Sequence, residues 1–185
     1  MMISRLLNLL VLLLEARGLY ISITSKRWKI LIFYTQLSNL VTALSALLYL
    51  ILPAVPAVTV LRYLSTCMLV LTFIVTTCVL IPMGGDAKKL LWSGNGIYHH
   101  VLCPVVSTLS YVLFERHVTG AVRLPVIVTL LYGIVMLYLN LIKKVDGPYP
   151  FFRVHQQSAV STVLWMVVLM AVMTGISAGV MMVAR

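Results

Sequence analysis

The sequence predicts an all-α integral membrane protein, a bundle of six transmembrane helices. Three observations lead to this fold class. Hydrophobic residues make up 62% of the 185 residues, whereas charged residues make up only 10%. The apolar residues gather in runs of roughly 18 to 25, the length that crosses a bilayer as a helix. Loops with proline, glycine and basic residues separate the runs. Six such spans leave too little chain for a soluble domain, so we expect a single transmembrane domain covering residues 1–185.

Each predicted helix is bounded by residues that interrupt a helix. The first is followed by Lys26, Arg27 and Lys29, which form a short basic loop. Pro53 ends the second, and the Pro82-Met83-Gly84-Gly85 turn ends the third, because proline lacks the N–H that a helix interior needs. A proline and aromatic loop, residues 147–152, precedes the sixth and is either a stiff turn or a lid over a site. We expect helices at residues 2–24, 30–52, 58–81, 96–114, 123–142 and 158–183.

The basic residues of the chain lie in short loops between the spans. The formal net charge is +10, which in a soluble protein would suggest nucleic acid. Here anionic lipid headgroups are the expected partners, and no nucleic acid is expected. Loops 25–29, 82–95 and 143–157 hold more lysine and arginine than the opposite side and are predicted to be cytoplasmic, with both termini outside. The opposite side holds Arg5, Arg62, Arg116, Arg123 and Arg185.

The second predicted helix carries a polar stripe. Its members follow one another at steps of three and four residues, so a helix lays them along one face. Hydroxyl and amide groups need partners inside a bilayer, and this face is therefore expected to turn toward other helices or an internal cavity. The stripe consists of Thr35, Ser38, Asn39, Thr42 and Ser45.

The stripe meets a histidine pair on the same side of the membrane, because the second, fourth and sixth helices all start there. Thr35 lies about five residues into its helix and His99 about three, at similar depths of roughly 5 to 8 Å. A threonine hydroxyl becomes a nucleophile when a base such as a neutral histidine takes its proton. Glu15 lies deeper in the first helix, and no other carboxylate is evidently placed to orient the histidine. We therefore expect a threonine and histidine dyad without a third member.

Three short motifs carry a resemblance to a known family. They are Phe-Tyr-Thr35-Gln-x-Ser-Asn at the start of the second helix, Asn95-Gly-Ile-Tyr-His99 with Pro104 five residues beyond, and the Tyr-Pro-Phe-Phe loop. With the six-helix hydropathy, they resemble the androgen-induced and androgen-dependent family of membrane proteins and its small bacterial relatives. That family consists of intramembrane threonine hydrolases that cleave fatty acid esters of hydroxy fatty acids. The resemblance implies that Thr35 is the nucleophile and His99 its base, although the adjacent His100 leaves that choice open.

Six further residues are expected to bind substrate or support the site: Ser38, Asn39, Asn95, Tyr98, His100 and Glu15. Asn39, Asn95 or Tyr98 would supply hydrogen bonds to the developing oxyanion. Glu15 would bind a cation, a proton or the polar part of a substrate, or would make a structural hydrogen bond. The three cysteines lack paired spacing, so neither a disulfide framework nor a metal site is indicated, and no cofactor is expected.

The hypothesis is thus an esterase whose acyl-chain substrate enters from the membrane lipids. Two alternatives belong to other classes. One is a non-enzymatic carrier of lipid or small molecules, in which the stripe lines a binding path and Glu15 is the coupling group. The other is a haem-binding bundle, in which His99 or His100 would pair with His155.

Overall fold

The structure is a computed structural model that describes residues 2–115 and 121–184, apart from the side chains of Lys26 and Trp28. The all-α prediction is confirmed. In the described ranges, six helices are long and apolar enough to cross a membrane. The main α-helices are α1 (Met2–Lys26), α2 (Tyr34–Ile51), α3 (Pro56–Val75), α4 (Cys103–Phe114), α5 (Arg123–Leu141) and α6 (Ala159–Val183). Arg116 and Arg185, two of the arginines that the topology argument uses, lie outside the described residues.

The predicted second helix begins later than expected. Arg27 has a φ of 51°, so α1 ends at Lys26 and the chain turns through a 3-10 helix, η1 (Arg27–Ile32). Phe33 is extended, and α2 therefore starts at Tyr34 instead of at residue 30. Thr35 consequently lies on the first turn of α2.

Two predicted helices contain wider, π-helical turns. The third helix continues from α3 into η2 (Thr76–Leu80), and the fourth begins with η4 (Ile97–Leu102) before α4. Pro104 has no N–H to donate to the carbonyl four residues before it, and the N–H of Cys103 reaches back five residues to Tyr98. Such turns rotate the side chains that follow them away from the α-helical register, and they are frequent at functional sites.

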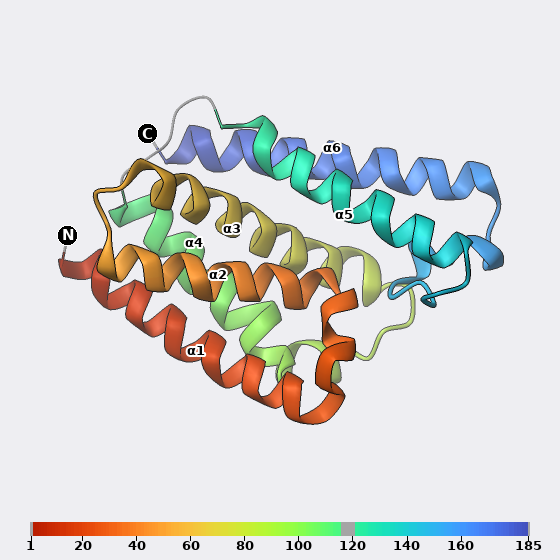
Figure 1. Ribbon diagram of the computed structural model, residues 1–185, viewed down its shortest axis with the longest axis horizontal. Helices are drawn as coiled ribbons and strands as arrows, with labels where there is room; N and C mark the ends of the chain where they lie inside the picture. The colour runs from red at the N-terminus through yellow and green to blue at the C-terminus, as the bar shows by residue number, and fades with distance from the viewer. Residues whose placement is uncertain (1, 116–120, 185) are drawn as a thin grey trace.

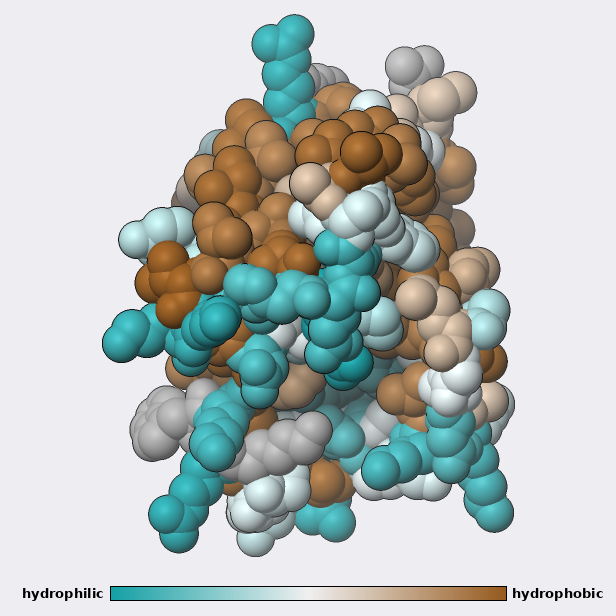
Figure 2. Space-filling view, turned by 90° about the vertical axis from the view of Figure 1, so that its right-hand side faces the viewer, coloured by the Kyte–Doolittle hydropathy of each residue, from teal (hydrophilic) through white to brown (hydrophobic). Residues whose placement is uncertain are grey.

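The helices form a group of four and a pair. α1 packs against α2 and α4, while α3 packs against α2 and α4 on one side and against α5 and α6 on the other (Figure 1). Both ends of the chain lie at one end of the bundle, as an even number of crossings requires. The starts of α2, α4 and α6 gather at the opposite end, here called the loop end. Hydrophilic residues cover much of this end, as expected for a membrane surface (Figure 2).

The interior of the four-helix group is polar along α1. Ser4, Asn8, Glu15 and Ser22 are all buried, and they follow one face of the helix. Asn8 donates hydrogen bonds to Ser110 and Glu115, and Ser22 accepts one from Asn95. Because no hydrophobic effect drives helices together in lipid, such polar contacts and close packing hold α1 on α4.

The structure corrects the sequence interpretation of Arg62. We counted it as a loop charge, but its side chain is fully buried and bound to Glu115. The Nε and Nη2 atoms of Arg62 donate to the two carboxylate oxygens at 3.0 and 2.9 Å. Asn8 and Ser110 also donate to Glu115. Arg62 is therefore an internal link between α3 and the end of α4, at the bundle end opposite the loop end.

Candidate functional site

Thr35 is buried, with 8% of its surface exposed, on the first turn of α2. The first N–H groups of a helix lack partners within the helix and carry partial positive charge. One of these, the N–H of Thr35, donates to the Tyr149 hydroxyl at 3.2 Å. That hydroxyl also shares a hydrogen bond of 3.2 Å with Thr35 Oγ1. Negative charge that develops on Thr35 Oγ1 would thus lie beside a helix N-terminus and a phenol.

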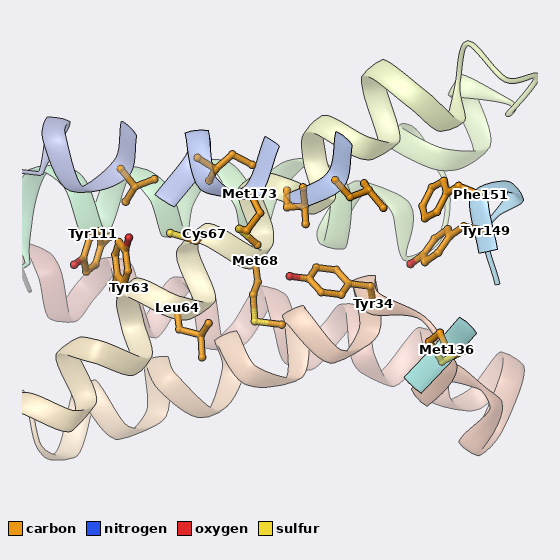
Figure 3. Close-up of a cluster of buried hydrophobic side chains, with 14 of the residues drawn as sticks. Tyr34, Tyr63, Leu64, Cys67, Met68, Tyr111, Met136, Tyr149, Phe151 and Met173 are labelled. Atoms are coloured by element: carbon orange, nitrogen blue, oxygen red, sulfur yellow. The ribbon is translucent and has the colours of Figure 1, made fainter. Parts of the chain in front are cut away.

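Tyr149 comes from the proline and aromatic loop, which inserts its rings into the bundle. Its ring stacks on Phe151 with centroids 5.2 Å apart, and both side chains are buried (Figure 3). Burial raises the pKa of Tyr149 above its ordinary value of 10.0, while the hydrogen bonds with Thr35 lower it by less. The phenol is therefore protonated at physiological pH and always has a proton to donate.

Thr35 lies between two hollows of different character. A narrow apolar cavity of about 40 Å³ runs between α3, α5 and α6, lined by residues such as Leu71, Leu169 and Met170. A larger cleft of about 430 Å³, here called the polar cleft because polar residues such as Gln36 and Asn95 form part of its lining, opens at the loop end. Three residues line both, namely Thr35, Leu80 and Tyr149. A molecule with an apolar tail and a polar head that occupied both hollows would cross from one to the other at Thr35.

Ser38 and Asn39 support Thr35 from the next turn of α2. Ser38 Oγ and Asn39 Nδ2 donate to the Thr35 carbonyl at 2.9 and 2.6 Å. Ser38 also shares a hydrogen bond with Thr72 on α3. Both residues belong to the predicted buried stripe, and these bonds fix the first turn of α2. The amide nitrogen of Asn39 is directed at the Thr35 carbonyl, so the hydroxyl that shares a hydrogen bond with Thr35 Oγ1 is that of Tyr149.

His100 lines the polar cleft together with Thr35. Its Nδ1 shares a hydrogen bond of 2.8 Å with Thr76 Oγ1, and Thr76 lines the apolar cavity. Both residues lie on π-helical turns, η2 and η4. In the tautomer in which Nδ1–H donates to Thr76, Nε2 has a free lone pair. A histidine held through Nδ1 with Nε2 as the base is the arrangement of a catalytic triad.

His99 is fully buried and lies in neither hollow. Its Nδ1 is 3.1 Å from Gln36 Nε2, and its Nε2 is 3.8 Å from Glu15 Oε2. The sequence interpretation placed Glu15 too deep to meet a histidine, and the structure corrects this. α1 approaches α4 closely because Gly18, one turn after Glu15, has no side chain, and a Cβ there would overlap the His99 ring. In the described part of the chain, no hydrogen bond links Thr35 to His99 or His100.

The remaining predicted residues are not all at the polar cleft. Asn95 lines the cleft and donates to Ser22 at 2.8 Å. Tyr98 packs against α1 beside Gly18. His155, the second ligand of the haem hypothesis, lines a different hollow, with Nε2 3.0 Å from the Asn140 carbonyl.

Two residues of the site were not among the predicted candidates. The sequence indicated Tyr149 indirectly, because the loop that contains it was expected to be a stiff turn or a lid over a site. Thr76 had no such indication, because its contact with His100 depends on two π-helical turns that hydropathy does not reveal. Comparison with protein-family models, curated proteins and solved structures found no match to this chain.

Proposed function

We propose that the protein is an intramembrane hydrolase of lipid esters, with Thr35 as the nucleophile. One observation carries this proposal: Thr35 lies on the wall that the apolar cavity and the polar cleft share. A lipid ester with its acyl chain in the cavity and its polar part in the cleft would have its ester carbonyl at Thr35. The resemblance to threonine hydrolases of fatty acid esters of hydroxy fatty acids supports the same substrate class.

In the proposed reaction, Thr35 Oγ1 attacks the ester carbonyl while a histidine removes the hydroxyl proton. The negative oxygen of the tetrahedral intermediate accepts hydrogen bonds at the α2 N-terminus, where Tyr149 is a donor. The intermediate collapses to an acyl-threonine, and the alcohol leaves with the proton from the histidine. Water, activated by the same histidine, then releases the fatty acid and restores Thr35.

The geometry favours His100 as the base over His99. His100 faces the polar cleft that Thr35 lines, whereas both ring nitrogens of His99 face the bundle interior. Thr76 would then orient His100 through Nδ1. Thr35 and His100 are not within hydrogen-bonding distance. The base would therefore act through a water molecule or after bound substrate closes the cleft, since catalytic hydrogen bonds are often long in apo sites and shorten on binding.

The rim of the cleft fits a substrate with a free carboxylate. Lys89 is exposed and lines the cleft. An ammonium group there would attract the carboxylate of a hydroxy fatty acid ester. The cytoplasmic orientation of the loop end, from the charge count, is part of this proposal and would place the cleft at the inner leaflet.

The test is hydrolysis of a hydroxy fatty acid ester by the purified full chain, compared among matched variants. Thr35→Ala should abolish turnover, whereas Thr77→Ala, which alters a threonine that lines neither hollow, should retain it. His100→Gln should lose at least a hundredfold, since a general base contributes about 10² to 10⁴. Unchanged turnover in folded Thr35→Ala would overturn the proposal. Loss in Thr76→Ala with retention in Thr35→Ala would move the nucleophile to Thr76.

A carrier of lipids or small amphiphiles is the second candidate. The absence of a direct bond between Thr35 and either histidine, both of which the structure describes, favours it, because a carrier needs no such contact. A carrier would bind the same ester saturably, and Thr35→Ala would keep that binding while no variant produced free acid.

A further inference from the structure

Glu15 is a carboxylic acid in the middle of a membrane-crossing helix. Its side chain is fully buried, and neither oxygen has a hydrogen-bond partner. The proposed hydrolase does not use it, since it lines neither hollow. A bare carboxylate buried in this way would cost several kcal/mol in lost hydration. Something must neutralise it.

The groups packed around Glu15 do not supply a free cation. η4 contributes His99 Nε2 at 3.8 Å, and α4 contributes the thiol of Cys103. α3 contributes Arg62, which is near enough to act on Glu15 but is already bound to both oxygens of Glu115. On α1 itself, Arg17 is exposed. Among the described residues, two groups can therefore approach Glu15 directly with a proton, namely the Cys103 thiol, which is a weak donor, and the His99 ring.

The proton on His99 can be placed from its other neighbour. If Gln36 presents its Nε2, that atom has only protons to give, so His99 Nδ1 accepts. A neutral imidazole then carries its proton on Nε2, which faces Glu15 across 3.8 Å. A neutral histidine does not cancel the charge of a carboxylate. One more proton, bound to Glu15, cancels that charge. Burying two neutral groups then costs less desolvation free energy than burying an ion pair.

We infer that Glu15 and His99 form a proton-binding site inside the membrane, in which Glu15 holds one proton as a carboxylic acid beside the neutral imidazole. Gln36 bonds to His99 and also lines the polar cleft, so it connects this site to the loop end. The uptake balances as one carboxylate plus one proton giving one neutral acid, with no other reactant. The site is independent of Thr35 chemistry, and its test needs no turnover.

The chain makes the test unusually specific, because it has only four acidic residues, Glu15, Asp86, Glu115 and Asp146. Asp86 and Asp146 are exposed, and Glu115 is ion-paired. Infrared spectra of the full chain in lipid nanodiscs at neutral pH should show the carbonyl band of a protonated carboxylic acid. The band should vanish in Glu15→Gln and remain in the control Asp86→Asn/Asp146→Asn. Absence of the band in the wild type, or its survival in Glu15→Gln, overturns the inference.

Thermal unfolding gives a second readout that separates a proton from other occupants. Glutamine imitates a protonated acid, so Glu15→Gln should unfold at the same temperature as the wild type or higher. Glu115→Gln, which removes a charge that pairs with Arg62, should unfold at a lower temperature. An equal loss in Glu15→Gln would show that Glu15 acts as an ion. If the wild type, but not Glu15→Gln, melted at a higher temperature in sodium chloride than in choline chloride, the site would hold a sodium ion. Either of these two results would reject proton binding.

Discussion

At the scale of single residues, the properties proposed for Thr35 come from its place on the helix. Two of its atoms meet the Tyr149 hydroxyl, and two side chains of the following turn hold its carbonyl. Thr35 Oγ1 itself shares a hydrogen bond with Tyr149, which lines both hollows as Thr35 does. The site residues therefore divide into Thr35, which would react, and its neighbours, which position it.

Tyr149→Phe tests the donor at Thr35. Loss of the hydroxyl removes one hydrogen bond at the reacting oxygen, and we expect kcat to fall by roughly 5- to 150-fold with little change in KM. Because burial raises the pKa of this phenol, it stays protonated as the pH rises, and the ratio of wild-type to variant activity should remain constant from about pH 6 to 9. Phe151→Leu, which changes the neighbouring ring, is the control. A ratio that collapses toward one within this range would contradict the role.

Lys89→Gln tests the carboxylate-binding rim of the cleft. We expect KM to rise several-fold for an ester with a free carboxylate and to stay unchanged for its methyl ester, because only the former carries the charge. Lys144→Gln, an exposed lysine outside the cleft, should change neither value. Equal effects on both esters would remove Lys89 from substrate recognition.

Residue-scale prediction from the sequence succeeded where periodicity was informative. The steps of three and four between Thr35 and Ser45 predicted a buried stripe, and all five residues are buried. Pairwise contacts across helices could not be predicted in the same way. The Thr76 and His100 contact depends on two π-helical turns, and the Glu15 and His99 contact depends on how closely α1 approaches α4.

At the scale of helices, α1 is held on α4 by polar contacts and by one close approach. Gly18 permits that approach, and its missing side chain leaves room for the His99 ring. The Arg62 and Glu115 pair joins α3 to the far end of α4. Both features lie inside the bundle, where polar groups must find their hydrogen-bond partners within the protein because neither water nor lipid supplies them.

Gly18→Ala should destabilise the protein by about 1 to 3 kcal/mol, because the added methyl group overlaps the His99 ring and pushes α1 outward. Gly179→Ala on α6 is the matched control, since nothing lies within 4 Å of its added Cβ. Thermal unfolding in detergent compares the two. Equal stability of Gly18→Ala and wild type would mean that α1 does not pack on α4 as described.

Arg62→Met should cost about 3 to 5 kcal/mol of unfolding free energy, because it leaves Glu115 buried without its partner. The double variant Arg62→Met/Glu115→Leu should regain most of that loss, since no buried charge remains. Arg123→Met changes an exposed arginine and should have little effect. A double variant as unstable as the single one would show that the cost does not arise from the stranded carboxylate.

At the scale of the whole molecule, the two groups of helices surround Thr35 with different kinds of side chains. The α1–α4 group has a polar interior, whereas the α5–α6 pair adds apolar side chains such as Met166 and Leu169 to the cavity beside α3. Thr35 lies where the polar loop end meets this apolar space. In the proposed hydrolase, a bundle of this kind would present a polar reaction centre to an apolar substrate within the membrane.

The sequence predicted the number and approximate bounds of the membrane helices, because length and hydropathy suffice for both. It also placed the starts of α2, α4 and α6 at one end, which follows from counting crossings. It did not predict which helices touch. Arg62 was read as a loop charge for that reason, since only the packing of α3 on α4 shows its buried partner.

The most direct test of the central claim is the site of covalent labelling by a serine-hydrolase probe in the full chain. Thr35 as nucleophile predicts one modified peptide, with the probe on Thr35, and no labelling in Thr35→Ala, while Thr77→Ala, outside both hollows, labels normally. Labelling at Thr76, or labelling that persists in folded Thr35→Ala, would contradict Thr35 as the nucleophile.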